Sequence, residues 1–308
     1  MLKPKRLRLG DKVAIVAPAS PFTKQEFDDG VAELRRLGFE PVHEPSVFAK
    51  LGGYLSGDAR LRAKAFLDAW RDPGIGAIMA ARGGYGSVHM LPYFDRAMLR
   101  EAPKPFIGYS DVTSLLTYLT VGCEIVSFHG PMLAGKIGKG TSAYDPDSML
   151  RALTRPEPLG ELAPPSLEAF RPGEAAGPLY GGTLAQLVAT LGTPFAFAPP
   201  KGYLLFLEDV AERPYRLDRM VTQLLLAGHL DSAVGIVLGE FVGCDEPGGE
   251  PAARAVLADL LKDFNGPVVF GFPSGHTAGP SMTLPLGVRA RLIANGKPRL
   301  IIEEAGVE

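Results

Sequence analysis

The sequence predicts an α/β fold with an N-terminal parallel-sheet α/β domain and a C-terminal α/β domain. Two observations support this. Short, continuously apolar runs of strand length are separated by amphipathic helical stretches, which is typical of a parallel sheet covered by helices on both faces. The pattern is interrupted once, by a stretch rich in glycine and proline, and a chain of 308 residues is long enough for two medium-sized domains.

The first 130 residues contain the clearest alternation of strands and helices. Apolar runs predict strands at 12–19, 75–81, 104–109 and 124–131. Apolar residues at helical spacing predict a helix that includes Phe27, Val31 and Leu34 and ends at Gly38. Further helices are expected at 58–70 and 110–119. These elements are enough for one parallel α/β domain.

The same kind of alternation returns in the last 130 residues. Helices are expected at 181–192, 215–228 and 252–264, and strands at 203–210, 233–241 and 267–273. The Asn295-Gly296 pair between two β-rich runs predicts a terminal hairpin. Between the two halves only one helix-like piece occurs, at 149–153. We therefore expect an N-terminal domain at 1–136, an interdomain connection at 137–178 and a C-terminal domain at 179–308.

The composition excludes several functional classes. The chain carries 32 basic and 34 acidic residues, a net charge of −2, so nothing indicates a nucleic-acid partner. No apolar stretch reaches the roughly 20 residues that a membrane span requires. The apolar run after the basic N-terminus is stopped by Pro18, which is unlike a secretory leader. The two cysteines, Cys123 and Cys244, form no CxxC motif, so we expect a reducing, cytoplasmic compartment.

Four polar features follow predicted strands directly. They are the glycine-rich loop at 82–86, Ser110, Glu208 and His276. Ligands of open parallel sheets bind outside the carboxyl ends of the strands. We therefore expect these features to lie at one site.

Ser110 has two interpretations. A glycine two residues before it, a preceding strand and a following helix resemble a nucleophile elbow, although Val112 replaces the second glycine of GxSxG. A serine nucleophile also needs a base, usually a histidine oriented by a carboxylate. Alternatively, Ser110 or Asp111 caps the helix by accepting hydrogen bonds from its first free amides. The local sequence leaves both open.

The loop Arg82-Gly83-Gly84-Tyr85-Gly86 also has two interpretations. Its glycines allow backbone amides to approach an anion, so it could supply half of an oxyanion hole, with the Asp111 amide as the other half. It could equally be a tight turn. It lacks the spacing of a phosphate-binding loop.

Glu208 ends an apolar run, where a carboxylate is costly to bury without a partner. A histidine, a backbone amide or Arg213 could be that partner. His276 lies between Gly275 and Thr277 in a loop, where a lone histidine is also compatible with simple exposure to solvent. The other histidines show no metal-ligand spacing, so neither a metal nor another cofactor is expected. They are His43, His89, His129 and His229.

Taken together, the ordered motifs resemble the LD-carboxypeptidase, or muramoyltetrapeptide carboxypeptidase, family (serine peptidase family S66). The motifs are VAPASP, ARGGYGS, FIGYSDVTSLL, HGPM, GGTLAQLVATLGTP, FLEDVAERPYRLDRM and GFPSGHT, and they extend from about residue 11 to 303. The resemblance implies two α/β domains with the active site between them. It also implies cytoplasmic homodimers that act in murein recycling.

The resemblance further implies the roles of individual residues. The family nucleophile falls on Ser110, the glutamate on Glu208 and the histidine on His276. The oxyanion amides would be those of Asp111 and of Gly84, rather than Gly83. Arg82 and Gly83 are weaker candidates for binding substrate. Arg82 would bind a substrate carboxylate, and a structural ion pair is its alternative role.

The implied reaction releases the terminal D-alanine from a murein tetrapeptide by cleaving its L,D bond. Two alternatives remain. One is a self-immunity hydrolase of the microcin C type, which needs an aromatic residue to stack on a base, and the connecting segment offers Tyr144 and Phe170 but no Trp. The other is a non-catalytic muropeptide-binding protein. One departure from the family is Thr183 in place of an asparagine in the GGN-L segment, which could alter specificity.

Overall fold

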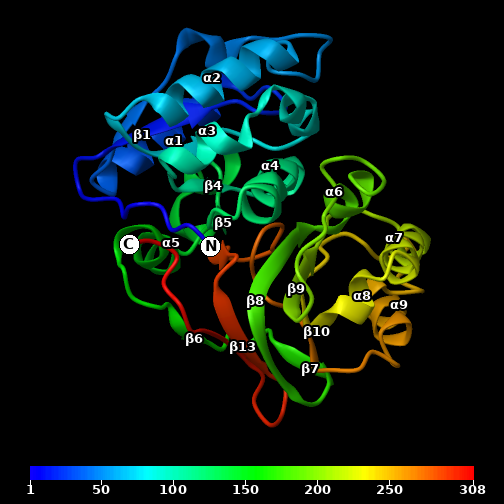
Figure 1. The fold of residues 1–308 in the computed structure, drawn as a ribbon. Helices are drawn as coiled ribbons and strands as arrows, with labels where there is room; N and C mark the ends of the chain where they lie inside the picture. The colour runs from blue at the N-terminus through cyan, green and yellow to red at the C-terminus, as the bar shows by residue number, and fades with distance from the viewer.

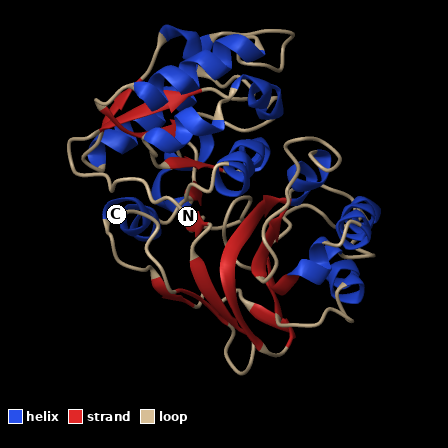
Figure 2. Cartoon of the chain, in the orientation of Figure 1, coloured by secondary structure: helices blue, strands red, loops and turns tan.

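The computed structural model describes all 308 residues and contains two β-sheets with helices packed against them (Figures 1 and 2). The first sheet has six strands in the order β12-β5-β4-β3-β1-β2. All pairs in it are parallel except β12 with β5. The strand bounds are β1 Lys12–Val16, β2 Glu40–Val42, β3 Ile75–Ala80, β4 Phe106–Gly108, β5 Ser127–His129 and β12 Leu284–Leu286. The expected parallel sheet of the N-terminal domain is confirmed.

The first three helices of this domain begin where the sequence supplies a cap. Thr23 and Glu26 form a reciprocal capping box at the start of α1 (Lys24–Arg36), and the Asp58 carboxylate accepts from the Leu61 amide at the start of α2 (Ala59–Arg71). Asp95 caps α3 (Arg96–Glu101) in the same way. The segment after β4 forms a 3₁₀ turn (Ser110–Val112), α4 (Thr113–Thr117) and a π-helical turn (Tyr118–Gly122).

The second sheet has eight strands in the order β6-β14-β13-β8-β9-β10-β11-β7. Its centre, from β8 to β11, is parallel, and antiparallel strands flank it on both sides. Its strand bounds are β6 Gly160–Leu162, β7 Glu168–Arg171, β8 Glu174–Thr183, β9 Tyr203–Glu208, β10 Ala233–Leu238, β11 Val268–Phe270, β13 Arg289–Ile293 and β14 Arg299–Ile302. β13 and β14 pair as the expected terminal hairpin.

Helices α7, α8 and α9 lie together on one side of this sheet (Figure 1). The helices after the first domain are α5 Pro146–Thr154, α6 Leu184–Ala189, α7 Pro214–Leu226, α8 His229–Ser232 and α9 Ala253–Leu260. The helix expected from residue 181 begins only at Leu184, because Gly181 and Gly182 are the last part of strand β8. Their φ angles are 141° and 144°, and a Cβ on Gly181 would lie 1.9 Å from the Phe206 carbonyl oxygen. Glycine is needed for this close pairing of β8 with β9.

Two segments form strands where the sequence order did not place them. The segment 137–178, expected to be a connection, supplies α5, β6, β7 and the first part of β8. Conversely, β12, from the expected C-terminal domain, pairs with β5 at the edge of the first sheet. The division at residues 136 and 178 is therefore kept only as a proposed boundary. The crossing of β12 ties the two halves together.

The buried core is continuous between the halves. One cluster of 62 buried residues includes the first sheet and reaches Leu204 and Phe206 of β9. A second cluster of 21 residues lies beneath α7 and α9. Because the packed apolar surface passes from one sheet to the other, residues on both can be held in a fixed geometry. No helix has both the length and the apolar character needed to cross a membrane.

Candidate active site

The four polar features lie after the carboxyl ends of their strands, as expected. The 82–86 loop follows β3, Ser110 follows β4, Glu208 is the last residue of β9, and His276 lies in the loop after β11. The first two belong to the N-terminal sheet and the last two to the C-terminal sheet. The candidate site is thus built from both halves of the chain.

Ser110 occupies a strained turn between strand and helix. Its φ is 64°, in the left-handed region that a residue with a side chain rarely adopts. Gly108 makes the turn possible, since a Cβ there would lie 2.8 Å from Val112 Cγ1. The Ser110 hydroxyl makes no hydrogen bond, and neither the 3₁₀ turn nor α4 has a side-chain cap. The capping interpretation of Ser110 is therefore wrong.

Asp111 does not cap the helix either, because its buried carboxylate binds the glycine-rich loop. It accepts from the Gly86 amide at 3.1 Å and the Ser87 amide at 2.8 Å. The Ser87 hydroxyl in turn donates to the Asp111 carbonyl at 2.6 Å. Burial raises the pKa of Asp111, and the bonds from Ser87 and Gly86 oppose that rise. These contacts fix the loop against the turn that carries Ser110.

Ser20 and Arg62 hold the loop from its other side. The Ser20 amide donates to the Gly83 carbonyl at 3.1 Å, and the Tyr85 amide donates to Ser20 Oγ at 3.1 Å. The buried Arg62 guanidinium donates to the carbonyls of Gly57 and Gly86 at 3.1 and 2.8 Å, and also to that of Pro18. The loop is therefore a fixed structure rather than an isolated tight turn.

The amides of Gly83 and Gly84 donate no hydrogen bond within the protein. Gly83 packs against the serine, because a Cβ there would lie 2.8 Å from Ser110 Cβ and 3.0 Å from Ser110 Oγ. Gly84 has a φ of 107° and faces Ser20. These two free amides belong to the loop that packs against Ser110, and they can bind an anion or a polarised carbonyl oxygen.

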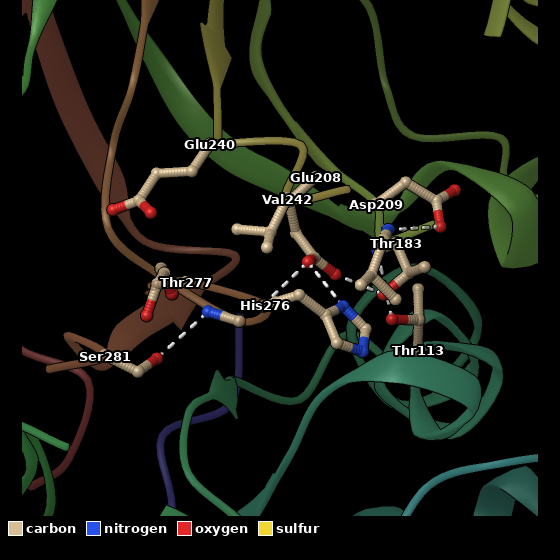
Figure 3. Close-up of polar contacts among 12 residues, drawn as sticks. Thr113, Thr183, Glu208, Asp209, Glu240, Val242, His276, Thr277 and Ser281 are labelled. Atoms are coloured by element: carbon tan, nitrogen blue, oxygen red, sulfur yellow. Dashed lines mark hydrogen bonds and ion pairs between the residues drawn. The ribbon is translucent and has the colours of Figure 1, made fainter. Parts of the chain in front are cut away.

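Glu208 and His276 form a close pair (Figure 3). His276 Nδ1 lies 2.7 Å from Glu208 Oε2, and the His276 backbone amide donates to the same oxygen at 2.9 Å. The Glu208 side chain is completely buried, whereas that of His276 is 18% exposed. The histidine partner that the sequence left open is thus present. Its bond to Nδ1 leaves Nε2 as the nitrogen available for proton transfer.

In the Glu208–His276 pair, each side chain stabilises the charged form of the other. Burial alone would raise the pKa of Glu208, but the charge of His276, its hydrogen bond and the nearby His129 outweigh it and hold that pKa well below its usual value. Burial alone would lower the pKa of His276, but the Glu208 charge raises it above its usual value. The neighbouring Asp209 has its pKa raised to about 7 by burial and by the Glu208 charge. These directions suit an imidazole that accepts a proton.

The structure does not show hydrogen bonds or ion pairs between all of the predicted site residues. No hydrogen bond connects His276 to Ser110, although the ring of Tyr109, directly before Ser110, lies 4.9 Å from the His276 ring. Such bonds are often long in ligand-free enzymes. Arg82 is exposed, forms no ion pair and donates one hydrogen bond to the Pro21 carbonyl at 3.0 Å. The structural ion pair considered for Arg82 is therefore absent.

The contacts of three supporting residues were not expected from the sequence, although Thr183 had been singled out as a departure from the family. The Thr183 hydroxyl donates to Glu208 Oε1, so the departure from asparagine lies at the carboxylate itself. Lys136 Nζ binds the Thr277 carbonyl and hydroxyl, both at 3.1 Å, and so supports the histidine loop. His129 lies 3.8 Å from Glu208. The HGPM motif was the available signal for His129, but no spacing rule linked it to a strand some 80 residues away.

Comparison with known proteins gives a consistent result over the whole chain. The family model for the LD-carboxypeptidase N-terminal domain matches residues 13–130, and that for the C-terminal domain matches residues 176–292. A probable murein peptide carboxypeptidase of Bacillus subtilis is 36% identical over 99% of this chain and 95% of its own length. A putative carboxypeptidase of Streptomyces coelicolor is 39% identical over 96% and 94%.

Solved structures have the same fold. The microcin C7 self-immunity protein MccF, known from Escherichia coli, superposes with a TM-score of 0.91 at 27% identity and covers 100% of both chains. Its structures include complexes with aspartyl sulfamoyl adenosine and glutamyl sulfamoyl guanosine. The muramoyltetrapeptide carboxypeptidase of Oxalobacter formigenes gives a TM-score of 0.83 at 29% identity over 96% of this chain and 99% of its own. From the two domain matches and these relatives, the chain belongs to the LD-carboxypeptidase family.

Proposed function

We propose that this protein is a serine carboxypeptidase that hydrolyses the L,D-peptide bond of a murein tetrapeptide and releases its terminal D-alanine. The observation that carries the proposal is that the glutamate–histidine pair of the C-terminal sheet lies against the N-terminal sheet, with the His276 ring 4.9 Å from that of Tyr109. Tyr109 directly precedes a strained serine, which packs against a loop with two free glycine amides. This is the set of groups that acyl transfer by a serine requires. The names of the bacterial relatives supply the substrate class.

In the proposed mechanism Ser110 is the nucleophile. His276 takes the Ser110 proton through Nε2 as Ser110 Oγ attacks the scissile carbonyl, and Glu208 stabilises the resulting imidazolium. The amides of Asp111 and Gly84 donate to the tetrahedral oxyanion. His276 then protonates the leaving D-alanine nitrogen. In the second half, His276 deprotonates water, which attacks the acyl-enzyme and regenerates the Ser110 hydroxyl.

Gly84 is proposed in preference to Gly83 because of their different surroundings. The α-carbon of Gly83 faces the Ser110 side chain, and the Gly84 amide follows directly after it. Arg82 lies at the start of the same loop and is an exposed residue. We propose that it binds a substrate carboxylate, and Arg82→Gln then raises KM several-fold with little change in kcat.

The decisive experiment measures D-alanine release from a murein tetrapeptide by the wild type and by Ser110→Ala. Wild-type release that is lost in a folded Ser110→Ala protein supports the proposal. A matched peptide that ends in L-alanine tests stereochemistry. Retained hydrolysis by Ser110→Ala, or equal hydrolysis of both peptides, contradicts the proposal.

A second candidate is a self-immunity hydrolase, which the close superposition with MccF favours. The aromatic side chains expected to stack on a base argue against it. Tyr144 is buried and donates to Glu33, and Phe170 stacks on Phe270 with ring centroids 5.0 Å apart. The one tryptophan, Trp70, is 1% exposed, in the core. Faster cleavage of an aminoacyl sulfamoyl adenosine than of the tetrapeptide would favour this candidate.

A non-catalytic muropeptide-binding protein is distinguished by a serine-reactive probe. Labelling of Ser110 that disappears in His276→Ala supports an enzyme, and no labelling supports a binding protein. From the family resemblance we also propose a cytoplasmic homodimer. Light scattering of the purified chain and fractionation of cells test these two points.

A further inference from the structure

His129 is a completely buried histidine that the proposed mechanism does not use. It is the last residue of β5, which pairs with β4, and the register places it opposite Gly108, two residues before Ser110. Its ring packs against Phe206 of β9, with centroids 5.0 Å apart, and against Tyr109 at 6.0 Å. His129 therefore belongs to the nucleophile's sheet but contacts the strand that carries Glu208.

His129 Nε2 faces the catalytic carboxylate. It lies 3.8 Å from Glu208 Oε1, which is longer than a hydrogen bond, and this buried nitrogen has no hydrogen-bond partner. Gly275 allows the approach, because a Cβ there would lie 2.7 Å from Glu208 Cδ and 2.8 Å from His129 Cε1. The carboxylate thus lies between two histidines, with His276 on Oε2 and His129 on the side of Oε1.

The hydrogen bonds around the ring determine where its proton lies. His129 Nδ1 is 3.0 Å from Ser274 Oγ, which is also 2.8 Å from the Met282 carbonyl. The Ser274 hydroxyl donates its one hydrogen to the Met282 carbonyl, so His129 Nδ1 donates to Ser274 Oγ. An unprotonated Nε2 would then direct a buried lone pair at the Glu208 carboxylate, which is unfavourable. The surroundings of the ring therefore favour a proton on Nε2 as well.

We propose that His129 is a positioning residue whose Nε2–H holds Glu208 from the N-terminal half and so aligns the Glu208–His276 pair with Ser110. The inference rests on the proposed function, since it assigns Glu208 and His276 their catalytic roles. Its physical basis is that the contact links β5, next to the nucleophile strand, to β9. A donor facing Oε1 also withdraws part of the negative charge that Glu208 offers to His276.

Few charged groups surround the Glu208–His276 pair, so the effect of His129 on the pKa of His276 can be measured. Tyr109 and Glu208 face His129 from β4 and β9. Around His276, Asp209 raises its pKa and Lys136 lowers it. Replacing His129 leaves all of these in place and returns the full Glu208 charge to His276. The pKa of His276 is therefore expected to rise.

The first test needs no substrate. Nitrogen-15 NMR of the histidine rings in the wild type, assigned with single-histidine variants, should show His129 Nε2 as a protonated nitrogen throughout the titration of His276. An unprotonated Nε2 overturns the proposal. Because this measurement is independent of hydrolysis, it remains decisive even if the tetrapeptide is not the substrate.

The second test compares His129→Leu, which removes the donor, with His129→Gln, which keeps one. In His129→Leu the His276 titration midpoint should rise by at least about half a pH unit. In the same variant kcat should fall about tenfold, with KM changed less than about threefold. His129→Gln should recover part of both, and His229→Leu, a half-buried histidine on α8, should change neither.

An unchanged His276 midpoint together with unchanged kcat in a folded His129→Leu protein overturns the proposal. If that variant does not fold, the wild-type nitrogen spectrum and the His129→Gln variant decide. Failure of the wild type to cleave the tetrapeptide, with both NMR results as expected, would contradict the proposed function but not the role of His129 in holding the pair.

Discussion

The two sides of the candidate site are held by different forces. On the N-terminal side the backbone does most of the positioning, through the φ of 64° at Ser110, the two free glycine amides and the Asp111 carboxylate bound to Gly86 and Ser87. On the C-terminal side, a buried charge does most of the positioning. Glu208 is completely buried and accepts from Thr183 and from both nitrogens of His276 that face it.

The difference indicates how each side tolerates change. A side positioned by backbone geometry is sensitive to an added Cβ, because the close packing leaves no space for a methyl group. A side positioned by a buried charge is sensitive to the loss of a hydrogen-bond donor, because the charge is then left without a partner. The predictions below test this contrast.

The largest effect is expected at Ser110. Ser110→Ala and Ser110→Gly should both lower kcat/KM by about 10,000-fold or more, since both remove the nucleophile. They should differ in stability, because only glycine adopts the left-handed φ without strain, and Ser110→Gly should be more stable than Ser110→Ala by about 1 kcal/mol. Equal denaturation midpoints would argue against backbone strain at this turn.

The second-largest effect is expected when the Glu208 charge beside His276 is removed. Glu208→Gln keeps the shape of the side chain but cannot stabilise the His276 imidazolium, so kcat should fall about 1,000- to 10,000-fold. The acid limb of the kcat/KM profile should move to lower pH, because the Glu208 charge raises the pKa of His276. A profile that keeps its wild-type midpoint would show that the Glu208 charge does not raise the pKa of His276.

An added methyl group at the loop tests the backbone side. Gly83→Ala places a Cβ 2.8 Å from Ser110 Cβ, so the serine or the loop must shift. Gly83 lies outside the left-handed region, so the fold should lose little stability while kcat falls about 100-fold. Gly248→Ala is the control for a mere glycine substitution, since Gly248 has no positive φ and a Cβ there meets no atom within 4 Å. Wild-type kcat in Gly83→Ala would contradict the close packing.

A lost donor on the base side should have a smaller effect. Thr183→Val removes the hydroxyl that donates to Glu208 Oε1 and preserves the shape. We expect kcat to fall about tenfold and unfolding to become easier by about 1–2 kcal/mol, since the carboxylate keeps its other donors. Thr183→Ser, which retains the hydroxyl, should stay near the wild type. Equal behaviour of the two variants would exclude a role for the hydroxyl.

The smallest effect is the pH dependence of stability. The pKa of His276 is raised on folding, so its contribution is complete below about pH 6.5 and is lost as the pH rises through the folded value. The pKa of Glu208 is lowered, so its contribution is lost as the pH falls from about 4.5. Stability from this pair should be greatest between these values, whereas activity needs neutral His276 and should increase above them. Urea unfolding across pH, compared with Glu208→Gln, measures the difference.

The sequence by itself determined the fold class, most element positions and the candidate residues. Apolar runs without alternation set the strands, and Thr23, Asp58 and Asp95 set the helix starts, because both signals act over a few neighbouring residues. The placement of Ser110 and Glu208 at strand ends followed from the same local patterns. The family resemblance added the roles.

Only the tertiary structure decided which residues meet. The pairing of β12 with the first sheet, the Thr183 and His129 contacts with Glu208 and the use of Asp111 on the loop amides all join segments distant in sequence. It also excluded the capping interpretation of Ser110, since neither the turn nor α4 has a side-chain cap and the serine has a positive φ. Local propensity carries no information about such contacts, because their energy comes from burial and charge shared between strands of two sheets.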